Sequence, residues 1–256
     1  MIKKTFLLLI TGLISCSLLS SEKSISHTYK IINMYPHDKE AFTQGLFYED
    51  GYLYESTGQY GTSSLRKVVP ETGDIIQIKM LPSDLFGEGI TAYQDTIIQL
   101  TWMSRIFLIY EKETFKILRL SKFTLPLEGW GLTFDGKNLI MSDGTQSLYF
   151  FDPEKLTPVN RIEVRDGIRP IYKLNELEFI KDKIFANIWQ SSSICIIDPK
   201  SGNVTGWIDL KNLVPKEFRT HADNVLNGIA YNPSEGTIYI TGKKWPYLYE
   251  LKINDL

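Results

Sequence analysis

The sequence has few of the residues with which enzymes bind metals or form covalent intermediates. Among its 256 residues are three histidines and two cysteines. Because His27, His37 and His221 form no ligand-like pair, a catalytic metal is not expected. No Gly-x-Ser-x-Gly elbow occurs and no histidine is placed to act as a base, which argues against a nucleophilic triad. A strong charge of one sign is also lacking: 28 basic residues oppose 30 acidic ones, so no field would attract nucleic acid or an anionic membrane.

The apolar run near the N-terminus is too short to span a bilayer permanently. Residues 6–14 are mostly apolar and follow two lysines, so we expect residues 1–21 to be a signal peptide that directs export. The run ends in Leu13-Ile14-Ser15-Cys16, which resembles the lipobox of bacterial lipoproteins. Lipidation of Cys16 would place the protein in the bacterial cell envelope, periplasmic or membrane-anchored, with the lipid as its one membrane contact. The alternative is an ordinary signal peptide cleaved a few residues later.

The second cysteine is expected to be a packing residue. Cys195 lies in the apolar string Ile194-Cys195-Ile196-Ile197, where a buried small side chain is more common than a reactive thiol. Because Cys16 belongs to the export signal, we expect no disulfide within the mature chain.

Five segments share one pattern: a polar or aromatic residue, usually a glycine, and then alternating apolar positions. They begin at residues 44, 88, 130, 175 and 227, in steps of 44, 42, 45 and 52 residues. Further strand-like segments follow each start. Four antiparallel strands at this period are typical of a propeller blade, whereas an apolar spacing of two argues against helical repeats. The sequence therefore predicts an all-β, five-bladed β-propeller.

The last repeat is incomplete, and this indicates how the ring closes. It ends at Leu256 after about three strands. We expect residues 29–35, which precede the first repeat, to supply its outer strand and cover an edge that would otherwise be open. Residues 28–256 would then form one domain, which we expect to be monomeric.

The repeat also predicts one shared site. Equivalent positions of a propeller face the same rim, so residues far apart in the chain should meet there. A turn residue or an aromatic channel filler would explain any one of these positions. Because all of these residues fall at equivalent positions of the repeat, the sequence instead favours a pocket with a few convergent polar groups. The positions are Gln44, Glu88, Trp130, Asn175 and Asn227 at the first strands and Gly58, Trp102, Gly144, Trp189 and Lys243 at the second.

Motifs in all five repeats resemble one enzyme family. They include Phe42-Thr43-Gln44-Gly45, Phe86-Gly87-Glu88-Gly89, Glu128-Gly129-Trp130-Gly131, Leu174-Asn175-Glu176-Leu177 and Thr241-Gly242-Lys243. Together they are similar to the plant and bacterial type of glutaminyl-peptide cyclotransferase, also called glutamine cyclotransferase. The resemblance covers the chain from about residue 35 to 251. It implies a five-bladed propeller that converts the N-terminal glutamine of peptides or proteins to pyroglutamate and releases ammonia.

The resemblance also implies which residues form the site. Glu88, Asn175 and Lys243 would be catalytic. The substrate-binding residues would be Phe42, Gln44, Phe86, Trp102, Trp130 and Trp189. The reaction is an acyl transfer that requires no cofactor.

The chemistry of cyclisation suggests a role for each polar group. The α-amine must lose a proton, and the departing nitrogen must gain one. Our hypothesis is that Glu88 carries this proton, with a pKa raised by desolvation. Asn175, Gln44 and Lys243 would orient the carboxamide and hold its oxygen.

Two other functions stay open at this point. A lipid-anchored propeller could be a non-catalytic scaffold of the cell envelope. A calcium-dependent lactonase would require several carboxylates at the axis, but the strand starts contain one, Glu88.

Overall fold

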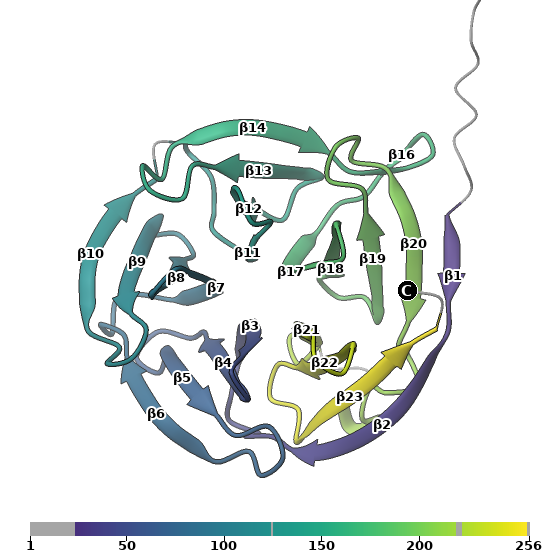
Figure 1. Ribbon diagram of the computed structural model, residues 1–256, viewed down its shortest axis with the longest axis horizontal. Coiled ribbons are helices and arrows are strands. Elements are labelled where there is room, and N and C mark those ends of the chain that lie inside the picture. The colour runs from purple at the N-terminus through teal and green to yellow at the C-terminus, as the bar shows by residue number, and fades with distance from the viewer. Residues whose placement is uncertain (1–23, 124, 219–221, 255–256) are drawn as a thin grey trace, which may run out of the picture.

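Alternating apolar residues produce antiparallel sheets that stand like blades around a central axis (Figure 1). The computed structural model describes residues 24–123, 125–218 and 222–254. It has the predicted all-β, five-bladed propeller, and its helical content in the described residues is one short 3-10 turn, η1 (Lys216–Phe218).

The first three blades each have four strands in chain order from the axis outward. Blade one comprises β3 (Thr43–Glu49), β4 (Tyr52–Thr57), β5 (Ser64–Val68) and β6 (Ile75–Met80). Blade two comprises β7 (Gly87–Tyr93), β8 (Thr96–Thr101), β9 (Ile106–Glu111) and β10 (Ile117–Lys122). Blade three comprises β11 (Leu132–Phe134), β12 (Leu139–Ser142), β13 (Ser147–Phe151) and β14 (Pro158–Glu163).

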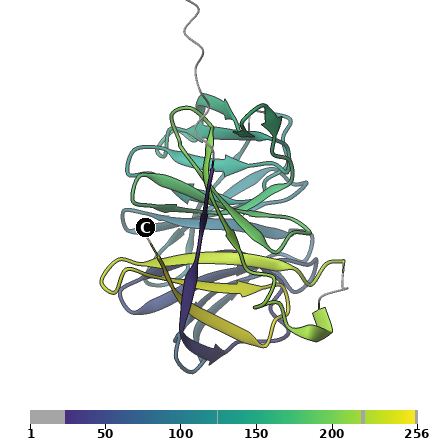
Figure 2. The same ribbon diagram turned by 90° about the vertical axis from the view of Figure 1, so that its right-hand side faces the viewer.

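The last two blades both receive a strand from the N-terminal segment. Blade four comprises β17 (Leu174–Ile180), β18 (Lys183–Ile188), β19 (Ser193–Ile197), β20 (Val204–Asp209) and the added β1 (Ile25–His27). Blade five comprises β21 (Leu226–Asn232), β22 (Thr237–Gly242), β23 (Tyr247–Ile253) and β2 (Tyr29–Pro36). The antiparallel pairing of β2 with β23 confirms the predicted closure. Figures 1 and 2 show β2 along the outer edge of this blade.

Two features were not anticipated from the repeat pattern. Strand β1 pairs in parallel with β20, which gives blade four a fifth strand. A small hairpin of β15 (Arg165–Asp166) and β16 (Arg169–Pro170) lies between blades three and four. Strand β1 has three residues, and the two hairpin strands have two each. Such short strands have no alternating apolar pattern that the sequence could show.

Apolar clusters fill the interfaces between neighbouring blades. The cluster between blades four and five contains fifteen buried residues, including Phe185 and Trp245. The cluster at the seam between blades one and five contains six, among them Leu46 and Tyr239. This seam is therefore the least apolar interface, and polar contacts supplement it.

The innermost strands approach one another closely because of small residues at their second position. A Cβ on Gly131 would lie 2.0 Å from the carbonyl oxygen of Asn175, so a side chain does not fit there. The fourth repeat has Glu176 at this position instead. Its carboxyl accepts hydrogen bonds from the backbone N–H groups of Leu46 (3.2 Å) and Ile229 (3.0 Å), which joins three blades across the axis.

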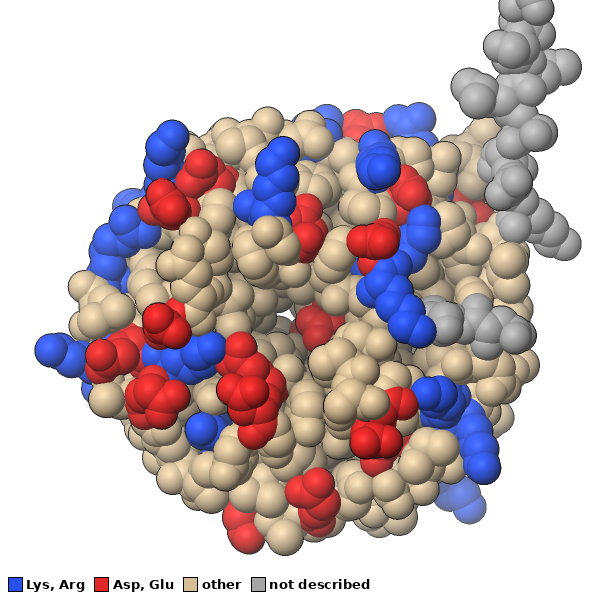
Figure 3. Space-filling model, in the orientation of Figure 1, with Lys and Arg blue, Asp and Glu red and all other residues tan. Residues whose placement is uncertain are grey.

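One face of the ring carries charges of both signs (Figure 3), and Cys195 is buried as its apolar neighbours predicted. On the face in Figure 3, acidic and basic side chains are interspersed and the centre of the ring is hollowed. Cys195 is fully buried in strand β19, and burial raises the pKa of its thiol. The predicted signal peptide and Cys16 lie outside the described residues. No helix within the described ranges is long and apolar enough to cross a membrane.

Candidate active site

A cavity of about 270 Å³ lies at the end of the ring where the innermost strands begin. All nine of the predicted catalytic and substrate-binding residues line it, and the structure thus brings all five repeats together. Asp223, in the connection between β20 and β21, is a tenth lining residue that the repeat pattern did not indicate. Figure 2 shows η1, which belongs to the same connection, projecting from one face of the ring. The lining residues are Phe42, Gln44, Phe86, Glu88, Trp102, Trp130, Asn175, Trp189, Asp223 and Lys243.

Aromatic rings form most of the wall, and Gly58 and Gly144 make room for them. Phe86 packs edge-to-face against Trp102 at 5.6 Å, and Trp130 against Trp189 at 5.8 Å. A Cβ on Gly58 would lie 2.3 Å from the Phe86 ring. The glycines at the ends of the second strands therefore alternate with large residues for a steric reason.

Glu88 is the buried carboxyl of this pocket. Its residue is 4% exposed, and its Oε1 accepts a 3.0 Å hydrogen bond from Nε2 of Gln44. Burial raises the pKa of Glu88 well above its ordinary value. The positive charge of Lys243 opposes this rise, whereas the negative charge of Glu128 adds to it. Such a carboxyl keeps its proton to a higher pH than an exposed glutamate does.

Lys243 is the cationic group of the pocket. Its residue is 5% exposed, and Nζ lies 4.7 Å from the centre of the Phe42 ring. Burial lowers the pKa of Lys243 to about 8, against the opposing effects of Glu88 and Asp223. The adjacent Lys244 adopts a φ of 59° and its N–H donates to Ala41 O at 2.7 Å. Of the two neighbouring lysines, the first therefore lines the cavity and the second forms the turn.

Asn175 has an unused acceptor inside the pocket. Its residue is 2% exposed, and its Oδ1 has no hydrogen-bond partner among the described residues. Buried acceptors without a partner are uncommon in folded proteins. The side chain is therefore suited to accept an N–H from a bound ligand.

Similarity to known proteins agrees with this arrangement. The family model described as glutamine cyclotransferase matches residues 6–253. The chain belongs to the glutamine cyclotransferase family. It is 38% identical over 227 residues to a glutaminyl-peptide cyclotransferase from Arabidopsis thaliana, over 88% of this chain and 71% of the relative. The fold is similar to the crystal structure of Myxococcus xanthus glutaminyl cyclase, with a TM-score of 0.84, 34% identity and coverage of 90% of this chain and 98% of that one.

In this member of the glutamine cyclotransferase family, Asn227 lies behind the pocket rather than in its lining. It is fully buried, and its Nδ2 donates to Thr43 O (2.9 Å) and to Gln44 Oε1 (3.4 Å). The repeat pattern placed Asn227 at the rim with the other strand starts. Its amide is used instead to hold the backbone and side chain of β3.

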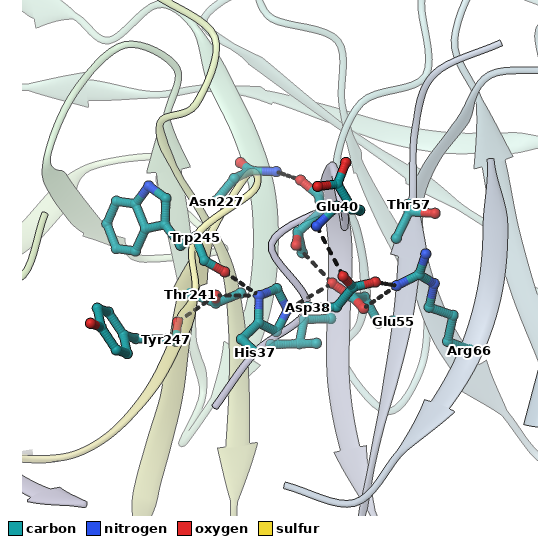
Figure 4. Close-up of polar contacts among 12 residues, drawn as sticks. His37, Asp38, Glu40, Glu55, Thr57, Arg66, Asn227, Thr241, Trp245 and Tyr247 are labelled. Atoms are coloured by element: carbon teal, nitrogen blue, oxygen red, sulfur yellow. Dashed lines mark hydrogen bonds and ion pairs between the residues drawn. The ribbon is translucent and has the colours of Figure 1, made fainter. Parts of the chain in front are cut away.

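A buried polar cluster supports the pocket at the seam of the ring (Figure 4). The His37 ring contacts Trp245 O at 2.8 Å and Glu55 Oε1 at 3.1 Å. Glu55 also accepts a 2.7 Å hydrogen bond from Thr43, which precedes Gln44. Trp245 follows Lys243 by two residues, so the cluster joins the segments that carry two pocket residues. Repeat phase did not reveal it, because His37 lies in the linker between β2 and β3.

A second cavity, of about 550 Å³, lies beside the connection that contains η1. It is the larger of the two, but its described lining contains one ionisable residue, Lys211, and no carboxyl. The smaller cavity combines a buried acid, a buried base and an unused amide acceptor. We therefore assign the chemistry to the smaller one. In the described part of the chain, no group of three or more His, Cys, Asp or Glu side chains is arranged to hold a metal ion.

Proposed function

We propose that the protein is a glutaminyl-peptide cyclotransferase, an acyltransferase that converts N-terminal glutamine of peptides or proteins to pyroglutamate. The observation that carries this proposal is a buried Glu88 carboxyl that shares an aromatic pocket with Lys243, in a chain of the glutamine cyclotransferase family. The pocket is large enough for a glutamine side chain folded back on its own amine. Around a bound glutamine side chain, its rings would exclude water from the reacting atoms.

In this mechanism Glu88 moves one proton and ends in its starting state. The α-amine nitrogen attacks the side-chain carboxamide carbon and a new C–N bond forms. Glu88 accepts the proton of that amine and returns it to the departing nitrogen. The old C–N bond then breaks, ammonia leaves, and the lactam remains. The raised pKa of Glu88 suits a group that is alternately base and acid.

The other polar groups orient the substrate and stabilise charge. The ammonium of Lys243 would stabilise the negative charge that develops on the carboxamide oxygen. The unused Oδ1 of Asn175 would accept an N–H of the substrate. Gln44 is already bonded to Glu88 and would keep that carboxyl aimed at the reacting nitrogens.

Ammonia release from a Gln-Ala dipeptide tests this proposal. The purified protein should release ammonia and form pyroglutamyl-alanine, identified by mass spectrometry. N-acetyl-Gln-Ala, which lacks a free amine, and Asn-Ala, which cannot close the same ring, are the controls. A folded protein that releases no ammonia from Gln-Ala at any pH would favour the non-catalytic scaffold.

We further propose that the protein is exported and anchored in the bacterial cell envelope through a lipid on Cys16, and that it acts as a monomer without a cofactor. The Leu13-Ile14-Ser15-Cys16 sequence after a short apolar run supports the anchor. Metabolic labelling with a radioactive fatty acid should label the wild-type protein and not a Cys16→Ala variant. Equal labelling of both would exclude this anchor.

A further inference from the structure

Glu128 lies between two walls of the pocket without lining the cavity itself. It precedes Trp130 by two residues, in the connection from blade two to blade three. Its Oε2 accepts a 2.7 Å hydrogen bond from Nε1 of Trp102 and a 3.0 Å hydrogen bond from Nε1 of Trp130. One carboxyl oxygen therefore joins an indole of blade two to an indole of blade three.

These two hydrogen bonds couple the aromatic pairs of the wall. Trp102 packs on Phe86, and Trp130 packs on Trp189. Hydrogen bonds to a charged acceptor are about twice as strong as neutral ones. Loss of the Glu128 carboxylate would leave the two half-buried indole N–H groups without a hydrogen-bond acceptor. The rings on both sides of Glu128 depend on the same atom for their orientation.

Glu128 also acts on the buried acid through charge. Glu88 is influenced by Lys243, whose positive charge favours the ionised carboxyl, and by Glu128, whose negative charge disfavours it. Burial remains the largest cause of the raised pKa of Glu88, so the charge of Glu128 is an added effect.

We propose that Glu128 is a positioning residue whose carboxylate holds Trp102 and Trp130 in the orientation that encloses the bound glutamine side chain. It touches the indoles rather than the substrate. The kinetic part of this inference rests on the proposed cyclotransferase activity. The orientation of the indoles does not, because it is a property of the free protein.

Three variants separate the hydrogen bonds from the charge. Glu128→Gln keeps a carbonyl oxygen as acceptor and removes the negative charge, whereas Glu128→Ala removes both. Trp130→Phe removes one donor and keeps the charge. Glu113→Gln is the matched control, because Glu113 is an exposed carboxylate in a turn of blade two.

We expect Glu128→Ala to lower kcat/KM for Gln-Ala by about 100-fold, since both indoles lose the charge-assisted hydrogen bonds that orient them. Its near-UV circular dichroism should lose the part that comes from the packed tryptophans. Glu128→Gln should lower kcat/KM by about tenfold and move the acidic limb of the kcat profile to lower pH, because the pKa of Glu88 falls. Trp130→Phe should leave that limb in place, although it weakens binding.

The inference is overturned if Glu128→Ala and Glu128→Gln match Glu113→Gln in kcat/KM, in the acidic limb and in near-UV circular dichroism. If Glu128→Ala does not fold, Glu128→Gln and Trp130→Phe still test the role of Glu128, because both variants keep at least one indole hydrogen bond. If the wild-type protein releases no ammonia, the proposed function fails. Near-UV circular dichroism of Glu128→Ala that matches the wild-type spectrum would refute the positioning role, whether or not ammonia is released.

Discussion

Gln44 and Glu88 occupy equivalent positions in blades one and two and are joined by a 3.0 Å hydrogen bond from Nε2 to Oε1. The Gln44 amide is held from its other end by Nδ2 of Asn227, which lies 3.4 Å from Oε1. Neighbouring blades therefore orient the buried acid before any substrate binds. Pre-organised polar groups of this kind need little rearrangement when the reaction occurs.

Replacing Glu88 with glutamine should separate catalysis from stability. Glu88→Gln keeps the acceptor for Gln44 and removes the proton carrier, so kcat should fall by about 100-fold or more. The melting temperature should be unchanged or higher, because the buried site disfavours the charged form of Glu88 and glutamine carries no charge. Steady-state kinetics and calorimetry check both parts. A Glu88→Gln enzyme with wild-type turnover would refute the proton-shuttle mechanism.

The pH profile should report Lys243. At low substrate the rate should climb through about pH 7 to 8 as the α-amine deprotonates. It should fall again as Lys243, with a pKa of about 8, loses its proton, which gives a narrow maximum near pH 8. Lys243→Gln should lower the rate and abolish the falling limb. Lys244→Gln is the control and should retain both limbs; a falling limb that persists in Lys243→Gln belongs to another group.

Chelation should leave the activity unchanged. None of the residues assigned to the reaction is assigned as a metal ligand, and the proton is carried by Glu88. We expect the same kcat and KM with and without saturating EDTA, over the whole pH range. Loss of activity that zinc restores would disprove a metal-free mechanism while leaving the fold intact.

Removal of β2 should open the ring. A chain that begins at residue 37 lacks the outer strand of blade five and its backbone hydrogen bonds to β23. With about 1 kcal/mol for each bond and a few degrees for each kcal/mol, the melting temperature should fall by roughly 10 °C or more. A chain that begins at residue 28 lacks only β1 and should lose much less. Equal melting temperatures for the two truncations would mean that closure by β2 does not stabilise the ring.

The buried polar cluster of His37, Glu55 and Trp245 at the seam should make the free energy of unfolding depend on pH. Burial disfavours the charged form of His37, but the carboxylate of Glu55 and the carbonyl of Trp245 outweigh it, and the pKa of His37 is raised. The pKa of Glu55 is lowered by His37 and Arg66, against the effect of burial.

The contribution of His37 is complete below its unfolded pKa of about 6.5 and is lost as the pH rises through its raised folded pKa. The contribution of Glu55 is complete above about pH 4.5 and is lost as the pH falls through its lowered folded pKa. His37→Gln should therefore lower the melting temperature more at pH 6 than at pH 9. An equal loss at the two pH values would show that the cluster does not depend on this charge.

The sequence alone determined the repeat, the number of blades, the closing strand and seven of the residues that meet in the cavity; Phe42 and Phe86 were added by the resemblance to the family. The features determined by the repeat follow from local patterns: alternation of two within strands, turns between them, and a period that places equivalent positions on one rim. Position in the repeat could not distinguish residues that line the pocket from residues packed behind that lining. Asn227 was expected at the rim, but its amide is bonded to β3 instead.

Only the tertiary structure decided the contacts between segments that the repeat does not relate. Asp223 reaches the cavity from an irregular connection, and His37 reaches the seam from a linker, so neither position has an equivalent in other blades. The bond from Trp102 to Glu128 crosses between blades. Burial, which sets the direction of the pKa shifts of Glu88 and Lys243, likewise arises when distant strands pack together around one axis.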